Sequence, residues 1–429
     1  MNRRFRIFAV FSALVAGPIS AAWAQQALPS VQAAQTPPPV PQPAPPPGLA
    51  PAPDVLAPIV LPPPIWTAGD ARELLGYIQR VGGEGLNPVN YDPAGLDVAI
   101  RSGVPEIMSK AANDRFNWLS SDLALGFVPR KERVQWFIQD GDLSTERQDQ
   151  LLRSAVQQHS ITATLNSLLP THAQYAALKN ALMITPPTDV ASVSRIRLNM
   201  DRWRWLPRDL GNKYIIVNVP AFHATLVENG VNRWKHKAIA GAPKTPTPQL
   251  SVLAVGVMFN PWWEVPPSIS KEVAGKPGYV ALKDKDGKLQ RWRQPPGPSN
   301  ALGQMKFVMY NPQNIYLHDT NARSRFSSRM RALSHGCIRT EHIHDLATEL
   351  LGDDGGEWIP EKIQATLTSK KTVQANFVKP VPVFIVYFSA AALNDGKIVN
   401  YDDMYGRDAK VLVALNAVRG SVGAKMAAR

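Results

Sequence analysis

Residues 316–339 read YLHDTNARSRFSSRMRALSHGCIR and include the only cysteine of the chain, Cys337. A thiol with an ordinary pKa near ~8.5 is mostly protonated at neutral pH, so a nucleophilic cysteine needs a base or a positive field. Two candidate bases are available: His318 ends a predicted strand, and His335 lies two residues before the cysteine. This stretch predicts a cysteine-dependent acyl-transfer site in which Cys337 is the nucleophile.

The residues that follow Cys337 predict how its thiolate is supported. Apolar residues recur at helical spacing between Ile343 and Leu351, Thr340 is a candidate N-cap, and Gly352 is a candidate stop. We therefore expect Cys337 to lie near the start of a helix, where the helix dipole favours thiolate. Gly336 lets the backbone approach a substrate, and amides around Cys337 are candidates to hold an oxyanion.

The chain on either side of this stretch predicts two kinds of structure. Residues 66–195 have helical periodicity, which indicates a helical domain. Residues 196–429 contain short β-rich runs, and Asn229-Gly230 between two of them predicts a hairpin. The expected fold class is α+β, with a helical N-terminal scaffold domain and a β-rich catalytic domain.

The N-terminus predicts export. Residues 1–24 contain three arginines, an apolar run too short to span a bilayer, and the candidate cleavage site Ala22-Trp23-Ala24, which is the pattern of a signal peptide. Residues 25–65 contain 15 prolines and one charged residue, Asp54, so we expect a linker in the polyproline II conformation. The sequence pattern alone leaves open whether the signal is cleaved.

The net charge and the cysteine content of the chain limit the classes of function that fit it. The net charge is 47 − 34 = +13, and it becomes 44 − 34 = +10 without residues 1–24. The chain has no concentrated Lys/Arg tract, so for an exported protein anionic cell-envelope polymers fit better than nucleic acid. A single cysteine cannot form an internal disulfide, and a lone exported thiol is either inert or retained for its reactivity.

The pattern of His318, a spacer, and Ser334-His335-Gly336-Cys337 resembles the catalytic signature of L,D-transpeptidases with a YkuD-type domain. Further stretches are similar to the YcbB-like branch of that family: Asn218-Val219-Pro220, residues 260–269, Asn300-Ala301-Leu302-Gly303, Lys306-Phe307, and Tyr405-Gly406-Arg407-Asp408. The resemblance covers residues 70–408.

The resemblance implies roles for individual residues. Cys337 would be the nucleophile, His318 the general base, and the backbone carbonyl of Asp319 the group that orients the imidazole. His335, with Ser334, would shape the site. Arg339 would either anchor a substrate carboxylate or support the loop.

The resemblance also implies a substrate and a place of action. The donor would be a peptidoglycan stem tetrapeptide, attacked at its position 3 diaminoacyl residue, and carbapenems would acylate the same cysteine. We expect a periplasmic monomer that acts in cell-wall cross-linking and cell shape, with no cofactor, no metal and no nucleic-acid partner. A short substrate cap at about 268–296 and no room for a peptidoglycan-binding module slightly favour L-Ala at position 1 as the acceptor over a position 3 amine.

Three alternatives remain at this point. Water could resolve the same thioester, which would make the protein an L,D-carboxypeptidase or another hydrolase. A zinc hydrolase could use His318, His335, Cys337, His342 and His344, although the chain has no His-Glu-x-x-His motif. A non-catalytic envelope-binding protein would keep Cys337 as an inert core residue.

Overall fold

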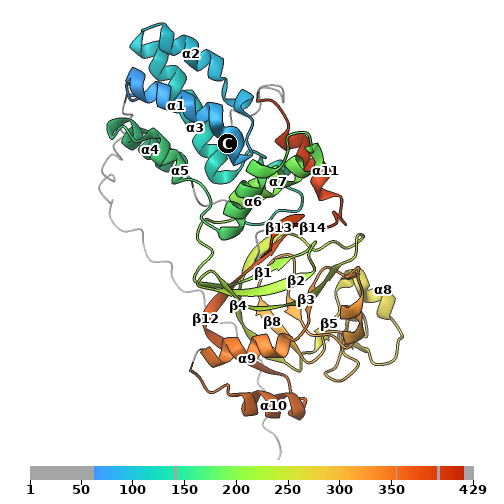
Figure 1. Cartoon of the computed structure of the whole chain (residues 1–429). Coiled ribbons are helices and arrows are strands. Elements are labelled where there is room, and N and C mark those ends of the chain that lie inside the picture. The colour runs from blue at the N-terminus through green and yellow to red at the C-terminus, as the bar shows by residue number, and fades with distance from the viewer. Residues whose placement is uncertain (1–61, 140–142, 354, 394–396, 420–429) are drawn as a thin grey trace, which may run out of the picture. The chain divides into compact units, whose positions relative to one another are not determined.

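The computed structural model describes residues 62–139, 143–353, 355–393 and 397–419 (Figure 1). The predicted signal peptide at 1–24 and the linker up to residue 61 lie outside the described residues. Across the described ranges, no helix combines the length and apolar character needed to cross a bilayer.

The N-terminal part of the described chain is helical, as its apolar periodicity predicts (Figure 1). Side chains cap several helix starts; Thr67 and Ser144, for example, each accept a hydrogen bond from the main-chain N–H three residues ahead. Residues such as Leu74 and Phe116 are fully buried in the shared core. The helices are α1 (Ala68–Arg80), α2 (Pro93–Arg101), α3 (Pro105–Leu125), α4 (Thr145–Gln157), α5 (Ile161–Asn166), α6 (Ala173–Ile184) and α7 (Val190–Arg204). The predicted boundary at 195/196 falls inside α7.

A nine-stranded mixed sheet follows α7, which confirms the predicted β-rich second region. Its order is β10-β3-β11-β9-β8-β4-β12-β1-β2, and β2 also pairs with β3, so eight of the strands close into a ring. Asn229 and Gly230 join β2 to β3 with φ of 50° and 77°, as expected for the predicted hairpin. The strands are β1 (Lys213–Asn218), β2 (His223–Glu228), β3 (Val231–Gly241), β4 (Leu250–Phe259), β8 (Met305–Met309), β9 (Leu317–His318), β10 (Ala332–Ser334), β11 (Ile338–Thr340) and β12 (Val373–Val386).

Smaller elements complete the β-rich region. Leu346 and Leu350 of helix α9 and Ile363 of α10 bury against the sheet core. The segment predicted as the cap, 268–296, contains α8, β6 and β7; with β5, which precedes this segment, the two strands form a separate three-stranded sheet ordered β5-β7-β6. The remaining bounds are β5 (Trp263–Glu264), α8 (Ser270–Val273), β6 (Val280–Lys283), β7 (Leu289–Gln294), α9 (Ile343–Asp353), α10 (Pro360–Ser369), β13 (Ala390–Ala392), β14 (Ile398–Asn400) and α11 (Arg407–Leu415).

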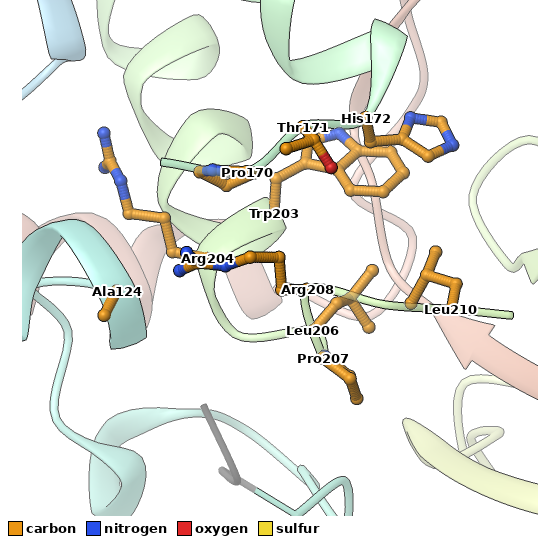
Figure 2. A pocket seen from close by; sticks show the side chains of 10 residues that line it. All are labelled: Ala124, Pro170, Thr171, His172, Trp203, Arg204, Leu206, Pro207, Arg208 and Leu210. Atoms are coloured by element: carbon orange, nitrogen blue, oxygen red, sulfur yellow. The ribbon is translucent and has the colours of Figure 1, made fainter. Parts of the chain in front are cut away.

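Aromatic stacking connects the end of α7 to the sheet. The Trp203 ring stacks on His172 at 4.2 Å and on Phe388 at 4.6 Å between ring centroids. His172 Nε2 lies 3.0 Å from the Tyr214 hydroxyl, and burial lowers the pKa of His172 to about 4. Figure 2 shows the residues that line a small pocket beside the His172 and Trp203 rings. The volume of this pocket is about 10 Å³. It has room for about one water molecule, and none of the predicted catalytic residues lines it.

A buried ion pair joins α7 to the C-terminal helix α11. Arg202 Nη2 lies 2.7 Å from Asp408 Oδ1, and 2% and 8% of these residues are exposed. Arg202 Nη1 also donates to Ser389 Oγ at 3.3 Å, and the Asp408 amide donates to Asp403. The attraction is strong here because little water screens it, but each charge depends on the other for compensation.

Replacing one member of this pair should destabilise the protein strongly. We expect Asp408→Asn to lower the free energy of unfolding by about 3–5 kcal/mol, because the Arg202 guanidinium stays buried without its counter-charge. The double variant Arg202→Met/Asp408→Leu should recover most of the loss. Urea unfolding followed by circular dichroism measures both, with Asp114→Asn in the exposed Lys110–Asp114 pair as the control that changes little. Equal stability of Asp408→Asn and the native chain would contradict this role.

Candidate functional site

Two short strand pairings, β9 with β11 and β8 with β9, arrange the site. β9 and β11 are parallel with Leu317 opposite Ile338 and His318 opposite Arg339. Leu317 and Ile338 are fully buried in the sheet core. Because side chains alternate across a strand, His318 and Arg339 lie on the other face. β8 adds Lys306 opposite His318 on that face, so three basic side chains form one row across the sheet.

Cys337 lies in the tight turn between β10 and β11. Ser334 Oγ closes this turn by donating to the Cys337 carbonyl at 2.6 Å and accepting from the Gly336 amide at 3.1 Å. Gly336 has φ of 120°, a conformation that favours glycine, and an added Cβ would lie 3.3 Å from Ile315 Cδ1. Because the Gly336 amide is already bonded to Ser334, the Cys337 amide is the better candidate donor to an oxyanion.

The expectation that Cys337 lies at a helix start is wrong. Strand β11 follows the cysteine directly, and α9 begins only at Ile343. Thr340 is buried in β11, and its Oγ1 has no hydrogen-bond partner among the described residues, so it does not cap the helix. The helix itself is correctly predicted, but Thr340 pairs with Ala238 of β3, which draws the chain into the sheet first. The helix dipole therefore does not support a thiolate at Cys337.

The thiol is instead surrounded by groups of the 314–316 segment. Cys337 Sγ donates to the Asn314 carbonyl at 3.5 Å, and the Tyr316 hydroxyl interacts electrostatically with the thiol and with Trp263. Cys337 is half-buried. Loss of water around the sulfur raises the pKa of Cys337 to about 11, although Tyr316, Lys306 and Arg339 partly oppose this rise. Cys337, the predicted nucleophile, is therefore a thiol in the resting site.

His318 is a buried, neutral imidazole. Its burial, reinforced by the positive charge of Arg339, lowers the pKa of His318 to about 3. The backbone of Asp319 favours the charged ring and partly opposes this shift. His318 Nδ1 is a buried atom with no hydrogen-bond partner among the described residues, so the orienting role of the Asp319 carbonyl stays a prediction. A neutral imidazole can accept a proton, which is what a general base must do.

The Asp319 side chain has a separate task. Its Oδ2 accepts from the Gln304 amide at 2.9 Å and from Arg323 Nη2 at 2.9 Å, and it lies 3.6 Å from His344 Nε2. Although burial alone raises the pKa of this carboxyl, the nearby His344 and the hydrogen bonds from Gln304 and Arg323 hold it well below its usual range. The charged carboxylate thereby fixes the chain directly after His318.

A hydrogen-bonded network that includes Tyr405 and Arg407 of the C-terminal segment holds the turn that contains Cys337. Thr247 Oγ1 donates to the Gly336 carbonyl at 2.7 Å and accepts from the Gly241 amide at 2.9 Å. The Tyr405 hydroxyl donates to the Gly241 carbonyl at 2.5 Å, and Arg407 Nη2 donates to the Thr247 carbonyl at 2.8 Å. Because Arg407 adjoins Asp408, this network and the Arg202–Asp408 ion pair connect α7 with the turn that holds the nucleophile.

His335 points toward the cap. Its Nε2 lies 3.3 Å from Glu272 Oε2 of α8, and both side chains are about half exposed. The cap has a small core in which Val265, Ile269 and Val273 are buried. His335 therefore contacts the cap, and it is suited to holding the cap near the turn.

The predicted residues separate into two groups in the structure. Cys337, His318 and Arg339 share one sheet face, whereas Ser334, Gly336 and His335 shape the turn and its contact with the cap. Sequence reasoning assigned no role to several other site residues. Strand alternation would have placed Tyr316 on the face of His318, but nothing local in the sequence predicts the others: Trp263, Glu272, Lys306 and Asn314.

Donor geometry does not support a zinc ion on Cys337. Within the described ranges, the group of three His, Cys, Asp or Glu side chains close enough to share an ion consists of His236, Glu341 and His342. Neither Cys337 nor His318 belongs to this group. His344, a further predicted ligand, faces the Asp319 carboxylate instead.

Two family models match the chain. Residues 212–381 match the YkuD family, described as an L,D-transpeptidase catalytic domain, and residues 62–182 match a domain described as a Scaffold domain. A curated Haemophilus influenzae protein named "Putative L,D-transpeptidase" is 29% identical over 336 residues, which cover 70% of this chain and 68% of that protein. The matches agree with the expected family and do not separate out its YcbB-like branch.

Solved structures give a weaker likeness. An L,D-transpeptidase from Mycobacterium smegmatis is 16% identical over 41% of this chain and 58% of its own, with a TM-score of 0.22. The catalytic domain of an Enterococcus faecium L,D-transpeptidase acylated by ertapenem is 15% identical over 42% of this chain and 99% of its own, with a TM-score of 0.21. The match therefore covers little more than half of the length of the M. smegmatis protein. TM-scores this low do not support a family assignment. The family assignment therefore rests on the two domain matches.

The pKa directions predict how Cys337 responds to pH. Between pH 6 and 10 its alkylation by iodoacetamide should accelerate about tenfold per unit, because thiolate is the reactive form and the pKa of the thiol is raised to about 11. Arg339→Gln should slow alkylation at each pH, because a nearby positive charge that stabilises the thiolate is lost. Intact mass against time measures the rate at the single cysteine. A plateau below pH 8 would instead indicate a thiolate already paired with imidazolium.

Proposed function

Since the chain contains a YkuD-type L,D-transpeptidase catalytic domain and a Scaffold domain, we propose that it cross-links peptidoglycan stem peptides through a thioester on Cys337. The observation that carries this proposal is the strand register in which Cys337 lies beside Tyr316 and two residues from His318, on a face with two further basic side chains. The proposed setting is the periplasm, after export through the N-terminal signal. Cell-wall cross-linking, and through it cell shape, would be the biological role.

The acylation step follows from the charges of the resting site. The sulfur attacks the carbonyl of the position 3 diaminoacyl residue while the thiol proton passes to neutral His318. A C–S bond forms, the C–N bond to the terminal D-alanine breaks, and His318 returns the proton to the leaving amine. Because thiol and imidazole are both neutral beforehand, proton transfer accompanies attack. Arg339 and Lys306 then face the negative charge that develops on sulfur and oxygen.

The transfer step reverses this proton movement. An acceptor amine attacks the thioester, a new amide C–N bond forms, the C–S bond breaks, and the amine proton returns to sulfur through His318. If water attacked the thioester in place of the amine, the protein would act as a carboxypeptidase. This is the second candidate function. Arg339 is the residue proposed to recognise a substrate carboxylate, because its buried Nε has no hydrogen-bond partner among the described residues.

Turnover should depend on Cys337 and His318 as a unit. Cys337→Ser should abolish product formation, because a hydroxyl of much higher pKa cannot be ionised by the same imidazole. His318→Ala should lose nearly as much, about 10³-fold or more, because nucleophile and base act together. Chromatography of products from tetrapeptide muropeptides measures both variants, with His159→Ala in the helical part as the control. A serine variant with native rates would place the chemistry elsewhere.

Carbapenems should acylate the same sulfur. The strained β-lactam carbonyl takes the place of the peptide carbonyl, so one adduct per chain is expected in the intact mass and none in Cys337→Ala. The E. faecium domain named above is described as acylated by ertapenem. An adduct that persists in Cys337→Ala would contradict the assignment of the nucleophile.

The acceptor amine should be L-Ala at position 1 rather than a position 3 amine. The cap is a short hairpin with one helical turn, so it restricts the acceptor little. An α-amine that titrates near ~8 is also unprotonated more often at neutral pH than a side-chain amine near ~10. Tandem mass spectrometry of the dimers formed with and without a free L-Ala terminus tests this. Dimers joined only between position 3 residues would refute it, and monomeric tripeptide alone would favour the carboxypeptidase.

A further inference from the structure

A cluster of metal-binding side chains lies away from the catalytic residues, where β3 meets the turn that leads into α9. His236 comes from β3, and Glu341 and His342 occupy that turn. One potential ligand atom from each residue lies within 4.8 Å of those of the other two. Two imidazoles and one carboxylate form a donor set that suits Zn²⁺ and similar borderline ions.

The backbone fixes the position of all three residues. Thr340 pairs with Ala238, and the Glu341 amide donates to the Lys237 carbonyl at 2.9 Å, which extends the β3–β11 ladder. The Lys237 amide in turn donates to Glu341 Oε2 at 3.3 Å. His342 has φ of 51°, and its carbonyl accepts from the Asp345 amide at 3.1 Å to begin α9. The cluster is therefore built on a strand and a helix start.

The two imidazole rings are already close together. The ring centroids of His236 and His342 lie 4.7 Å apart at 47°, and Trp234 packs against His236 at 4.5 Å. His342 Nδ1 lies 3.5 Å from Asp345 Oδ2, an arrangement that leaves Nε2 available for an ion. A carboxylate bonded to the second nitrogen is the usual support of a metal-bound histidine.

The charges around the cluster also suit a cation. Glu341 and Asp345 contribute negative charge. Lys237 brings an opposing positive charge, with its Nζ 3.6 Å from Glu341 Oε1, and this half-exposed side chain can move into solvent.

We propose that His236, Glu341 and His342 bind one divalent transition-metal ion of the Zn²⁺ class, with water completing the coordination. The site is separate from the proposed catalytic centre. His236 shares the sheet face of Ala238 and Thr340, opposite Arg339, whereas Glu341, on the Arg339 side by the same alternation, lies where the β3–β11 ladder ends. A bound ion would link β3 to the start of α9, just beyond the C-terminal end of β11, the strand that contains Arg339. The inference does not depend on the transpeptidase proposal.

Zn²⁺ binding to the full chain tests the site, with Cys337→Ala as the background because a thiol also binds zinc. Calorimetry should give one Zn²⁺ per chain for Cys337→Ala. Adding His236→Ala or His342→Ala should weaken binding at least tenfold, whereas His344→Gln, two residues along α9, should leave it unchanged. Co²⁺ substitution should give tetrahedral d–d absorption bands that His342→Ala loses.

Thermal unfolding gives an independent measure. Saturating Zn²⁺ should raise the Tm of Cys337→Ala and of its His344→Gln derivative, but not that of its His342→Ala derivative. Circular dichroism without metal checks that each variant folds. No bound Zn²⁺ in Cys337→Ala, or equal affinity in all three histidine variants, would overturn the proposal.

Discussion

The pairing of β9 with β11 is the constraint on which the catalytic arrangement depends. Leu317 and Ile338 are opposite each other and fully buried, so the sheet core holds the register of two very short strands. A slip of one residue would turn His318 into the core and expose Leu317. Burial of two aliphatic side chains thus decides that His318 and Arg339 share a face beside Cys337.

Support for the nucleophile comes from distant parts of the chain. The cysteine turn is closed locally by Ser334, but its Gly336 carbonyl is held by Thr247, and Thr247 is held by Arg407. The neighbouring Asp408 pairs with Arg202 at the end of α7. None of the predicted catalytic residues comes from the described helical part, yet this part is linked through buried hydrogen bonds to the residues that hold the turn. Such networks rigidify a site because each buried polar group depends on its partners.

The electrostatics differ from those predicted for a cysteine at a helix start. Burial raises the pKa of Cys337 to about 11 and lowers that of His318 to about 3, so both groups are neutral at rest. Lys306 and Arg339 supply the positive field that the helix dipole was expected to provide. In such a site charge develops only when the substrate carbonyl is attacked, which is where preorganised positive groups contribute most.

The sequence alone predicted a candidate nucleophile and a candidate base, and it determined the α+β fold class, the Asn229-Gly230 hairpin and the apolar stripe of α9. These features follow from local chemistry or from short periodic patterns. The tertiary structure decided the rest: the strand that follows Cys337, the contacts of Tyr316 and Trp263 near the sulfur, the contact of Glu272 with His335, and the meeting of His236 with His342. Each of these brings together residues that are distant in the chain or whose local preference was overridden. Thr340, for example, is a good helix cap by itself, but pairing with Ala238 places it in a strand.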